Sequence, residues 1–319
     1  MGRLPGPLGE PGAGEAGAEG SGREPAPSTV LLSPGRLALR RLAANRAALA
    51  AALFVLLLAL VAVFAPYVAP HDPTTQFADG LTAQGQPVPS TLPHSTRFLL
   101  GTDANGRDLL SRLIWGARVS LTVGVLANAL AVGVGLLVGA TAAYVGGWPG
   151  QVLMRLTDMV MAFPTLLLAL ALIAVLKPGM GVIILVIGGV YWTWIARVIY
   201  GEVRAIREQE FILAAESLGA SRARILFRHV VPQLVPTLIV WTSLGIATNV
   251  MLEASLSYLG IGIQPPTPSW GVMIQEGQTY FRTAPWLVLY PGLAILLTVL
   301  SFNVLGDGLR DALDPRRGR

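Results

Sequence analysis

Long runs of apolar residues, separated by clusters of charged residues, dominate the sequence. A helix needs about 20 mostly apolar residues to cross the hydrocarbon core of a bilayer. Its backbone amides must hydrogen-bond within their own segment, because lipid offers no partners. Uncharged runs of sufficient length occur at 47–71, 119–154, 159–176, 178–196, 234–252 and 286–305. This pattern predicts an all-α membrane protein with six transmembrane helices, the second followed by a turn rich in Gly and Pro.

Composition supports a membrane protein and excludes several classes of chemistry. Of the 319 residues, 53% are hydrophobic and 13% charged, whereas a soluble domain carries about 25% charged residues. A soluble enzyme is therefore excluded. The chain has no Cys and three His, which excludes disulfides and thiolate ligands and argues against a metal site. Arginine supplies all but one of the 23 basic residues; these flank the spans, so no nucleic-acid partner is expected.

The distribution of arginines orients the spans, because cytoplasmic loops carry an excess of basic residues. Four arginines between positions 36 and 46 lie directly before the first span, six lie in the loop at 196–233, and four lie in the tail at 307–319. Alternation of the spans then places both termini in the cytoplasm. The segment at 66–118 is external in this topology although it also holds arginines, since long loops are less constrained by charge.

The same reading divides the chain into five parts. Residues 1–35 are rich in Gly, Pro, Ala and Glu, which predicts a disordered cytoplasmic tail. The remaining parts are an amphipathic lead-in with the first span at 36–66, an external segment at 67–118, a core with spans two to six at 119–306, and a cytoplasmic tail at 307–319. The core includes a cytoplasmic loop at 202–233.

The chain shows no residues for covalent chemistry of its own. The only lysine, Lys177, is followed by Pro178, so no ATP-binding loop ending in Gly-Lys-Ser/Thr is present. The predicted span interiors contain no ionisable residue, and Asp158 and Glu253 lie at span ends. A proton- or sodium-coupled carrier places carboxylates near the midplane, so this class is disfavoured. Any energy for work must come from a partner.

Polar and small residues within the spans suggest helix contacts. Interhelical hydrogen bonding is the favoured role for the buried asparagines, with lining of a transport path as the alternative; these are Asn128, Asn249 and Asn303. Small residues recur every four positions in span two, at Ala127, Ala131, Gly135 and Gly139. Such a stripe lets two helices approach closely, either within this chain or with a second subunit. A chance run in an Ala- and Gly-rich chain is the other reading.

The loop at 202–233 predicts a helix–turn–helix in the cytoplasm. Phe211, Ala214, Ala215 and Leu218 fall at helical spacing on one face. Gly219 supplies the backbone freedom of a helix end, and Ser221 can cap the next helix, which leads to Pro232 and span five. An ordinary surface hairpin would show the same pattern.

This loop resembles the EAA loop of binding-protein-dependent ABC importers. Ala214, Ala215, Gly219 and Pro232 fill the positions of the motif, whereas Leu213 stands where the motif has glutamate. In that family the loop is the coupling helix that docks on the ATPase subunit. The resemblance implies a docking role for Phe211, Ala214, Ala215, Glu216, Ser217, Leu218, Gly219, Ala220 and Arg222.

Three further segments resemble the C-type permease subunit of dipeptide, oligopeptide and nickel importers. They lie at 100–121, 259–274 and 302–316. The first carries the Gly-Thr-Asp-x-x-Gly-Arg-Asp signature, and its candidate residues are Gly101, Thr102, Asp103, Gly106, Arg107, Asp108, Ser111 and Arg112. Its acidic and basic side chains have close helical spacing and can pair with one another, with a solvated surface as the alternative.

The second segment is expected to shape an external gate or docking surface. Its prolines stiffen the loop, and Trp270 can anchor it at the membrane interface. The candidate residues are Pro265, Pro266, Pro268, Ser269, Trp270 and Gly271. In the third segment, Asp307, Arg310 and Asp311 are expected to stop span six at the headgroups.

Together these likenesses imply a permease subunit with the type I ABC importer fold in a bacterial inner membrane. The implied partners are a homologous second permease, two ATPase subunits that hold ATP and Mg²⁺, an extracytoplasmic substrate-binding protein and the lipid bilayer. No cofactor is implied in this chain. The other readings are a carrier or channel that works without ATPases, and a membrane scaffold that transports nothing.

Overall fold

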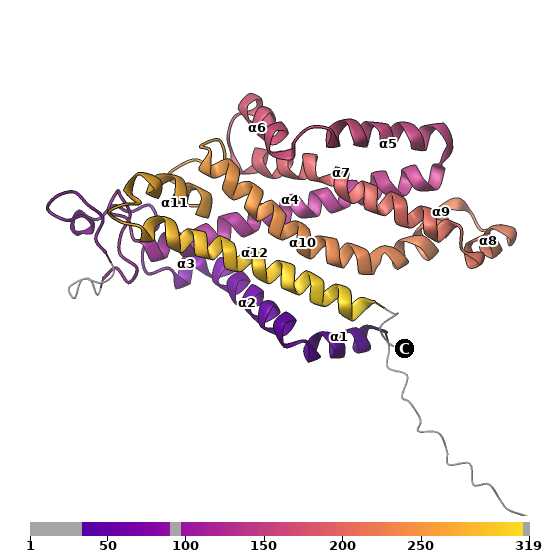
Figure 1. Cartoon of the computed structure of the whole chain (residues 1–319), viewed down its shortest axis with the longest axis horizontal. Coiled ribbons are helices and arrows are strands. Elements are labelled where there is room, and N and C mark those ends of the chain that lie inside the picture. The colour runs from indigo at the N-terminus through magenta and orange to yellow at the C-terminus, as the bar shows by residue number, and fades with distance from the viewer. Residues whose placement is uncertain (1–33, 90–96, 315–319) are drawn as a thin grey trace, which may run out of the picture.

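The computed structural model describes residues 34–89 and 97–314. The predicted N-terminal tail and the last five residues lie outside these ranges, apart from the tail's final two residues. Within the described ranges the chain is helical without a strand, and two isolated bridges occur at Leu81–Pro87 and Thr102–Asp108. Most of the long helices run side by side along the long axis of the molecule (Figure 1).

The helices divide into long rods and short connecting pieces. The long ones are α2 (Arg46–Val63), α4 (Leu109–Val145), α7 (Met180–Arg207), α10 (Val231–Tyr258) and α12 (Trp286–Leu313). The shorter ones are α1 (Pro34–Ala44), α3 (Ala65–Val68), α5 (Gly147–Met161), α6 (Thr165–Leu176), α8 (Glu210–Ser217), α9 (Arg222–Ile225) and α11 (Trp270–Gly277).

The number of possible membrane spans is five or six. Among the described residues, five helices are long and apolar enough to cross a membrane, and α5 with α6 makes a sixth if that bent pair counts as one span. One of the five runs without interruption from Arg222 to Tyr258, because a π-helical segment at Leu226–Val230 joins α9 to α10.

The third predicted span, at 159–176, is not one straight helix. α5 and α6 meet at an angle of 86°. At 12 residues, α6 is only about 18 Å long, too short to cross the hydrocarbon alone. Pro164 lies directly before α6, and a residue before proline avoids the α conformation. The chain therefore breaks at Phe163, so the uncharged run is only part of a broken span or re-entrant loop.

Three helix ends also differ from the expected boundaries. α12 continues to Leu313, so the charged residues after Leu305 extend the last helix instead of stopping it. α10 continues six residues beyond Leu252, which brings Glu253 inside the helix. α4 begins at Leu109, within the segment expected to be external. Charged residues therefore do not mark the ends of these helices.

α4 lies at the centre and packs against α2, α7 and α10. The stripe of small residues faces α7 within the same chain. A Cβ atom at Gly135 would lie 2.7 Å from the Cβ of Ile195, and one at Gly139 would overlap the backbone of Ala196. Ala127 and Ala131 are fully buried on the same stripe. The absence of side chains here lets two backbones approach, as in other lipid-embedded helix pairs.

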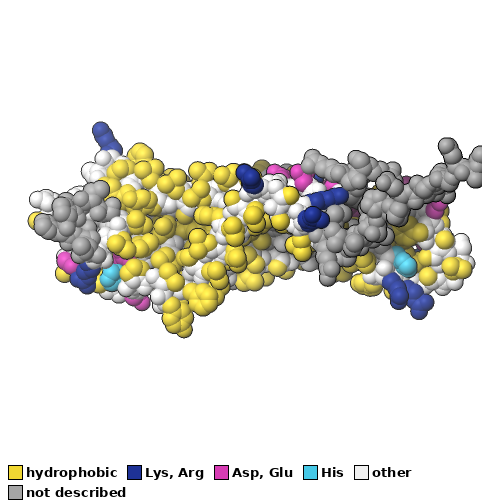
Figure 2. Space-filling view, turned by 90° about the horizontal axis from the view of Figure 1, so that it is seen from below, with side chains coloured by type: hydrophobic (Ala, Val, Ile, Leu, Met, Phe, Trp, Pro, Cys, Tyr) yellow, Lys and Arg dark blue, Asp and Glu magenta, His cyan; other side chains and the backbone are white. Residues whose placement is uncertain are grey.

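Apolar side chains also cover the outside of the molecule. Figure 2 shows hydrophobic side chains over most of the left and middle of one face. Exposed leucines on α2 include Leu53, Leu56, Leu57 and Leu60. A water-soluble surface would not carry such a continuous patch, so this surface is suited to contact with lipid or with another membrane helix.

Candidate functional site

The loop at 202–233 folds as the predicted helix–turn–helix. α8 ends at Ser217, and Gly219 adopts φ +79°, a left-handed conformation that glycine reaches without steric cost. The Ser221 hydroxyl then accepts a hydrogen bond from the Arg224 amide and caps α9. We call residues 210–225 the coupling hairpin. It continues without a break into α10.

Buried apolar side chains attach the coupling hairpin to the membrane helices. Ile212 and Ile225 are fully buried in one cluster with Val203 and Ile206 of α7. The same cluster includes Ala140, Ala143 and Tyr144 of α4, and Arg207 at the end of α7 joins α7 to α4, because its Nη1 donates to the Ala143 carbonyl at 2.9 Å. The hairpin is therefore packed onto the ends of α4 and α7 and cannot swing freely.

The opposite face of the hairpin is apolar and exposed. Leu218 is 89% exposed, Phe211 and Leu213 are exposed as well, and so is Phe227, two residues beyond the hairpin. Ala214, Glu216, Ser217, Gly219 and Arg222 are also exposed, whereas Ala215 and Ala220 are half-buried against the cluster beneath. The residues expected to form one docking face therefore lie on two sides of the hairpin. Ala215 and Ala220 point toward the protein, and Leu218 points away from it.

At the other end of the molecule, the Gly-Thr-Asp signature builds a buried ionic cluster. Arg107 Nε donates to Asp103 Oδ2 at 2.6 Å, and Arg112 Nε lies 3.2 Å from the same oxygen. Glu276 of α11 completes the cluster, because its Oε2 accepts from Arg107 at 2.9 Å and from Arg112 at 2.6 Å. Two acids and two bases thus neutralise each other. Asp103 and Arg107 pair across a turn with Gly106 at φ +75°, and not along a helix as their spacing suggested.

The remaining signature residues hold the segment that precedes α4 against the start of that helix. Asp108 caps α4 and accepts from both the amide and the hydroxyl of Ser111, at 2.9 and 2.5 Å. The Ser111 hydroxyl in turn accepts from the His71 amide. The Thr102 hydroxyl donates to the Gly80 carbonyl, and the Gly101 carbonyl accepts from the Leu109 amide. The motif is therefore buried and not solvated, and its role here is structural, because it holds the preceding chain against the start of α4.

Glu253 forms a second buried polar site at the same end. It is fully buried inside α10, and it accepts hydrogen bonds at 2.7 Å from Ser120 of α4 and from Ser257. Ser269 supplies a further hydrogen bond. α10 extends past Glu253 to Tyr258, so this carboxyl lies within the helix and not at its end. Because three hydroxyls satisfy it and it lines none of the cavities described below, this carboxyl ties helices together.

The outer loop is partly buried in this region. Trp270 is 1% exposed, and its Nε1 donates to the Leu113 carbonyl at 3.1 Å. Trp270 is therefore a core residue at this end of the molecule and not an anchor at the membrane surface. Pro265 and Pro266 are exposed, whereas Pro268, Ser269 and Gly271 are buried. Gly271 packs against Ala254 of α10.

The three asparagines lie away from the open spaces along α10. Asn128 Nδ2 donates to the Thr242 carbonyl at 3.0 Å, which joins α4 to α10. Asn249 is fully buried, and Asn303 is half-buried on α12. None of them lines either of the two cavities described next.

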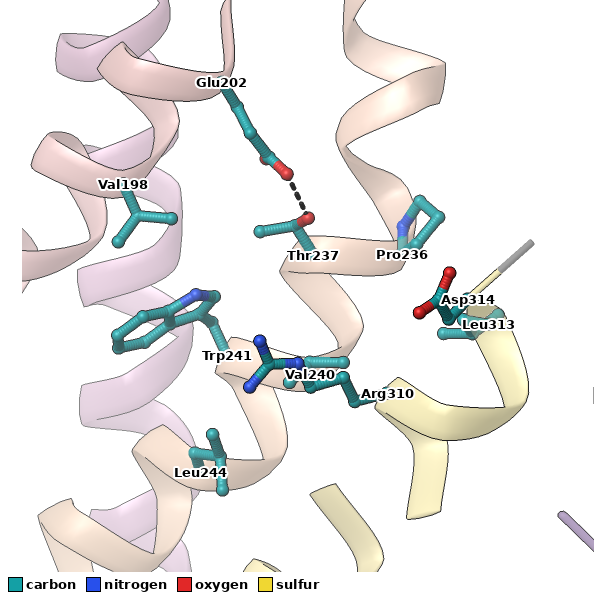
Figure 3. Close-up of a pocket in the computed structure, with 10 residues that line it drawn as sticks. All are labelled: Val198, Glu202, Pro236, Thr237, Val240, Trp241, Leu244, Arg310, Leu313 and Asp314. Carbon is teal, nitrogen blue, oxygen red and sulfur yellow. Dashed lines mark hydrogen bonds between the residues drawn. The ribbon is translucent and has the colours of Figure 1, made fainter. Parts of the chain in front are cut away.

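Two cavities follow one face of α10. The first, of about 490 Å³, lies between the ends of α7, α10 and α12 nearest the coupling hairpin (Figure 3). The second, of about 440 Å³, lies between α6, α7 and α10 and includes Tyr191, Trp194 and Thr248. Trp241 borders both. Sequence reasoning missed these lining residues, because Thr and Trp within an apolar run give no signal of what they face.

Comparison with known proteins decides the family. The family described as "Binding-protein-dependent transport system inner membrane component" matches residues 131–319. The chain belongs to this family of ABC importer permeases. The family described as "N-terminal TM domain of oligopeptide transport permease C" matches residues 33–85 of the permease.

Relatives of the permease cover nearly the whole chain. A di/tripeptide transport system permease protein DppC from Pseudomonas aeruginosa is 42% identical over 291 residues, which are 91% of this chain and 95% of the relative. The glutathione transport system permease protein GsiD from Escherichia coli is 42% identical over 277 residues, 87% of this chain and 89% of that one. GsiD from Pectobacterium atrosepticum is 39% identical over 284 residues, 89% and 92% of the two chains.

A solved structure shares the fold. A chain of the MetNI methionine ABC transporter in an inward-facing conformation has a TM-score of 0.53 at 16% identity, over 64% of this permease and 96% of that chain. The likeness is one of architecture. The predicted ABC importer permease fold and the resemblance to its peptide-importer branch are therefore confirmed.

Proposed function

We propose that this permease forms the path by which short peptides cross the inner membrane, together with a homologous second permease subunit. Its relatives named for di/tripeptides and for glutathione support a small peptide as the substrate. An extracytoplasmic binding protein delivers the peptide, and two ATPase subunits holding ATP and Mg²⁺ drive transport by alternating access. The family description supports the dependence on a binding protein.

In this proposal the chain crosses the membrane six times with both termini in the cytoplasm. The broken pair α5–α6 counts as the third span. The coupling hairpin and the cavity of Figure 3 then face the cytoplasm, and the ionic cluster with α11 faces the outside. The arginine-rich loop at 196–233 supports this orientation.

The coupling hairpin is the observation that carries the proposal. It presents an apolar face to the cytoplasm, it is packed onto α4 and α7, and it is continuous with α10. An exposed apolar patch on a rigid support marks a protein contact. A partner that moves this patch also moves α10, which borders both cavities.

Leu218→Glu tests the contact with the ATPase subunit. Leu218 is 89% exposed, so a charge there leaves the hairpin folded but opposes burial in an apolar groove. We expect ATP-dependent peptide uptake by the assembled complex in proteoliposomes to fall roughly tenfold or more, with normal insertion of the permease. Leu99→Glu, at an exposed position of the external segment, is the matched control and should transport normally.

Uptake by Leu218→Glu at the rate of the unmodified complex would contradict the assignment of the hairpin. Ala215 is a poorer probe, because it is half-buried and a charge there would disturb the hairpin itself. Gly219→Val should also impair coupling, through the backbone, since a β-branched residue is disfavoured at φ +79°.

A further inference from the structure

The cavity near the cytoplasmic ends of the helices carries opposite charges on different helices. Glu202 comes from α7 and Arg310 from α12, and between them lie Thr237 and Trp241 of α10 (Figure 3). The volume of about 490 Å³ is within the range of about 300–1,000 Å³ that is typical of small-molecule pockets. Charged side chains in the wall make it unsuitable for a lipid tail.

The carboxylate of Glu202 is only half satisfied. Its Oε1 accepts a hydrogen bond from the Thr237 hydroxyl at 2.5 Å. Its Oε2 is buried and has no hydrogen-bond partner among the described residues. A buried carboxylate oxygen without a donor is costly. A ligand that brings a cationic donor, such as an ammonium group, would remove this cost.

Arg310 supplies the complementary charge. Its side chain reaches from α12 toward Trp241 (Figure 3), and its guanidinium offers planar paired donors that suit a carboxylate. Asp314, which directly follows α12, also lines the wall, and the apolar lining residues include Val198, Val240 and Leu244. The cavity therefore combines an acceptor for a cation, a donor for an anion and an apolar surface with one indole ring.

We infer that this cavity is an exit-side binding site for a short zwitterionic peptide. Glu202 binds the terminal ammonium group, Arg310 binds the terminal carboxylate, and Trp241 packs against the peptide side chains. The inference rests on the proposed function and names a site within it. Trp241 also borders the second cavity, so a peptide that leaves that cavity along α10 passes the indole before it reaches the exit site.

The spacing of lining residues along α10 supports one continuous route. Thr237, Trp241 and Leu244 line the exit site, and Trp241, Thr248 and Met251 line the second cavity. Positions three or four apart share one face of a helix. A single face of α10 therefore connects the two cavities, with Trp241 at the boundary.

Binding of L-alanyl-L-alanine tests the site. The purified complex of this permease with its partner subunits is placed in lipid nanodiscs without binding protein or nucleotide. We expect saturable binding of the radiolabelled dipeptide. The N-acetylated dipeptide lacks the ammonium group and the C-amidated dipeptide lacks the carboxylate, so each should bind about tenfold more weakly or worse.

The two charged residues should each control one end of the peptide. In Glu202→Gln, the preference for the free over the N-acetylated dipeptide should disappear, while the preference over the C-amide remains. In Arg310→Gln the reverse should hold. Asp307→Asn, at an exposed position of the same helix outside the cavity, and Arg282→Gln, an exposed arginine near the other end of the molecule, are the matched controls. Both should keep both preferences.

Loss of selectivity at only one end distinguishes direct contact from general damage, because a misfolded variant loses both preferences. Absence of dipeptide binding to the unmodified complex, or preferences unchanged in Glu202→Gln and Arg310→Gln, would overturn the exit site. ATP-dependent uptake with the binding protein is measured on the same preparation. Normal uptake without the binding pattern refutes this site alone, whereas no uptake refutes the proposed function.

Discussion

Single residues at the outer end of α4 show how charge is held away from water. Arg112 is 1% exposed and shares the carboxylates of Asp103 and Glu276 with Arg107. A buried charge is tolerated when it is paired, and removal of one partner leaves the other uncompensated. Glu276 is the bridge between α11 and the external segment, so the cluster fixes the outer loop in place.

Glu276→Ala should therefore destabilise the protein. Two arginines would lose their shared acceptor, which we expect to cost about 3 kcal/mol and to lower the temperature of unfolding of the protein in detergent. Asp79→Ala removes a carboxylate from the exposed pair with Arg97 and should cost less than about 1 kcal/mol. Equal unfolding temperatures for the two variants would show that the cluster contributes nothing.

At this scale the sequence predicts local pairs and misses distant ones. The four charged signature residues lie within ten positions, so their proximity could be inferred. Glu276 is 164 residues from Arg112, and nothing in the sequence connects them. The sequence also does not reveal that Trp270 is buried, because an aromatic residue near a span end suits the membrane interface as well as a protein core.

Among the elements, the contact between α4 and α7 depends on the missing side chain of Gly139. A Cβ atom there would overlap the backbone of Ala196. Backbone cannot move aside as the end of a side chain can, so the helices would have to separate. The four-residue spacing of small residues identified this stripe from the sequence, but only the structure shows that its partner is α7.

Gly139→Leu should weaken this contact. We expect a loss of about 2 kcal/mol or more in stability and a lower yield of folded protein, measured by size-exclusion chromatography after heating. Gly133→Leu provides the control, because Gly133 lies on the same helix with nothing within 4 Å of its would-be Cβ. That variant should be as stable as the unmodified protein or more so, since Leu favours a helix.

Helix positions were predictable, and helix ends were not. Apolar runs in the sequence locate the long helices, because a helix that crosses the hydrocarbon core needs apolar side chains. The run at 159–176 hides a break of 86°, although Pro164 gave a signal for it. The sequence places Glu253 at the end of span five because charge is unusual in lipid, yet its serine partners on α4, α10 and the outer loop satisfy it.

For the whole molecule, the proposed orientation has a direct test, because the chain has no native Cys. Ser221→Cys and Thr267→Cys place single thiols at exposed positions at opposite ends of the molecule. An impermeant maleimide should label Thr267→Cys in intact cells and Ser221→Cys only after the membrane is opened. Ser269 is unsuitable because it is buried and caps α11.

Labelling of Ser221→Cys in intact cells would contradict the proposed orientation and favour the opposite one. The coupling hairpin and the exit-side site would then both face the wrong compartment.

The helix that runs without a break from Arg222 to Tyr258 can convert a small tilt at its hairpin end into a larger displacement of its far end. Its 37 residues correspond to a rod about 55 Å long. A tilt of about 5° about its hairpin end displaces the far end by about 5 Å. Because Glu253 accepts a hydrogen bond there from Ser120 of α4, such a displacement must either carry α4 along or break that hydrogen bond. A small rotation at the hairpin end of this helix is thereby transmitted to its other end.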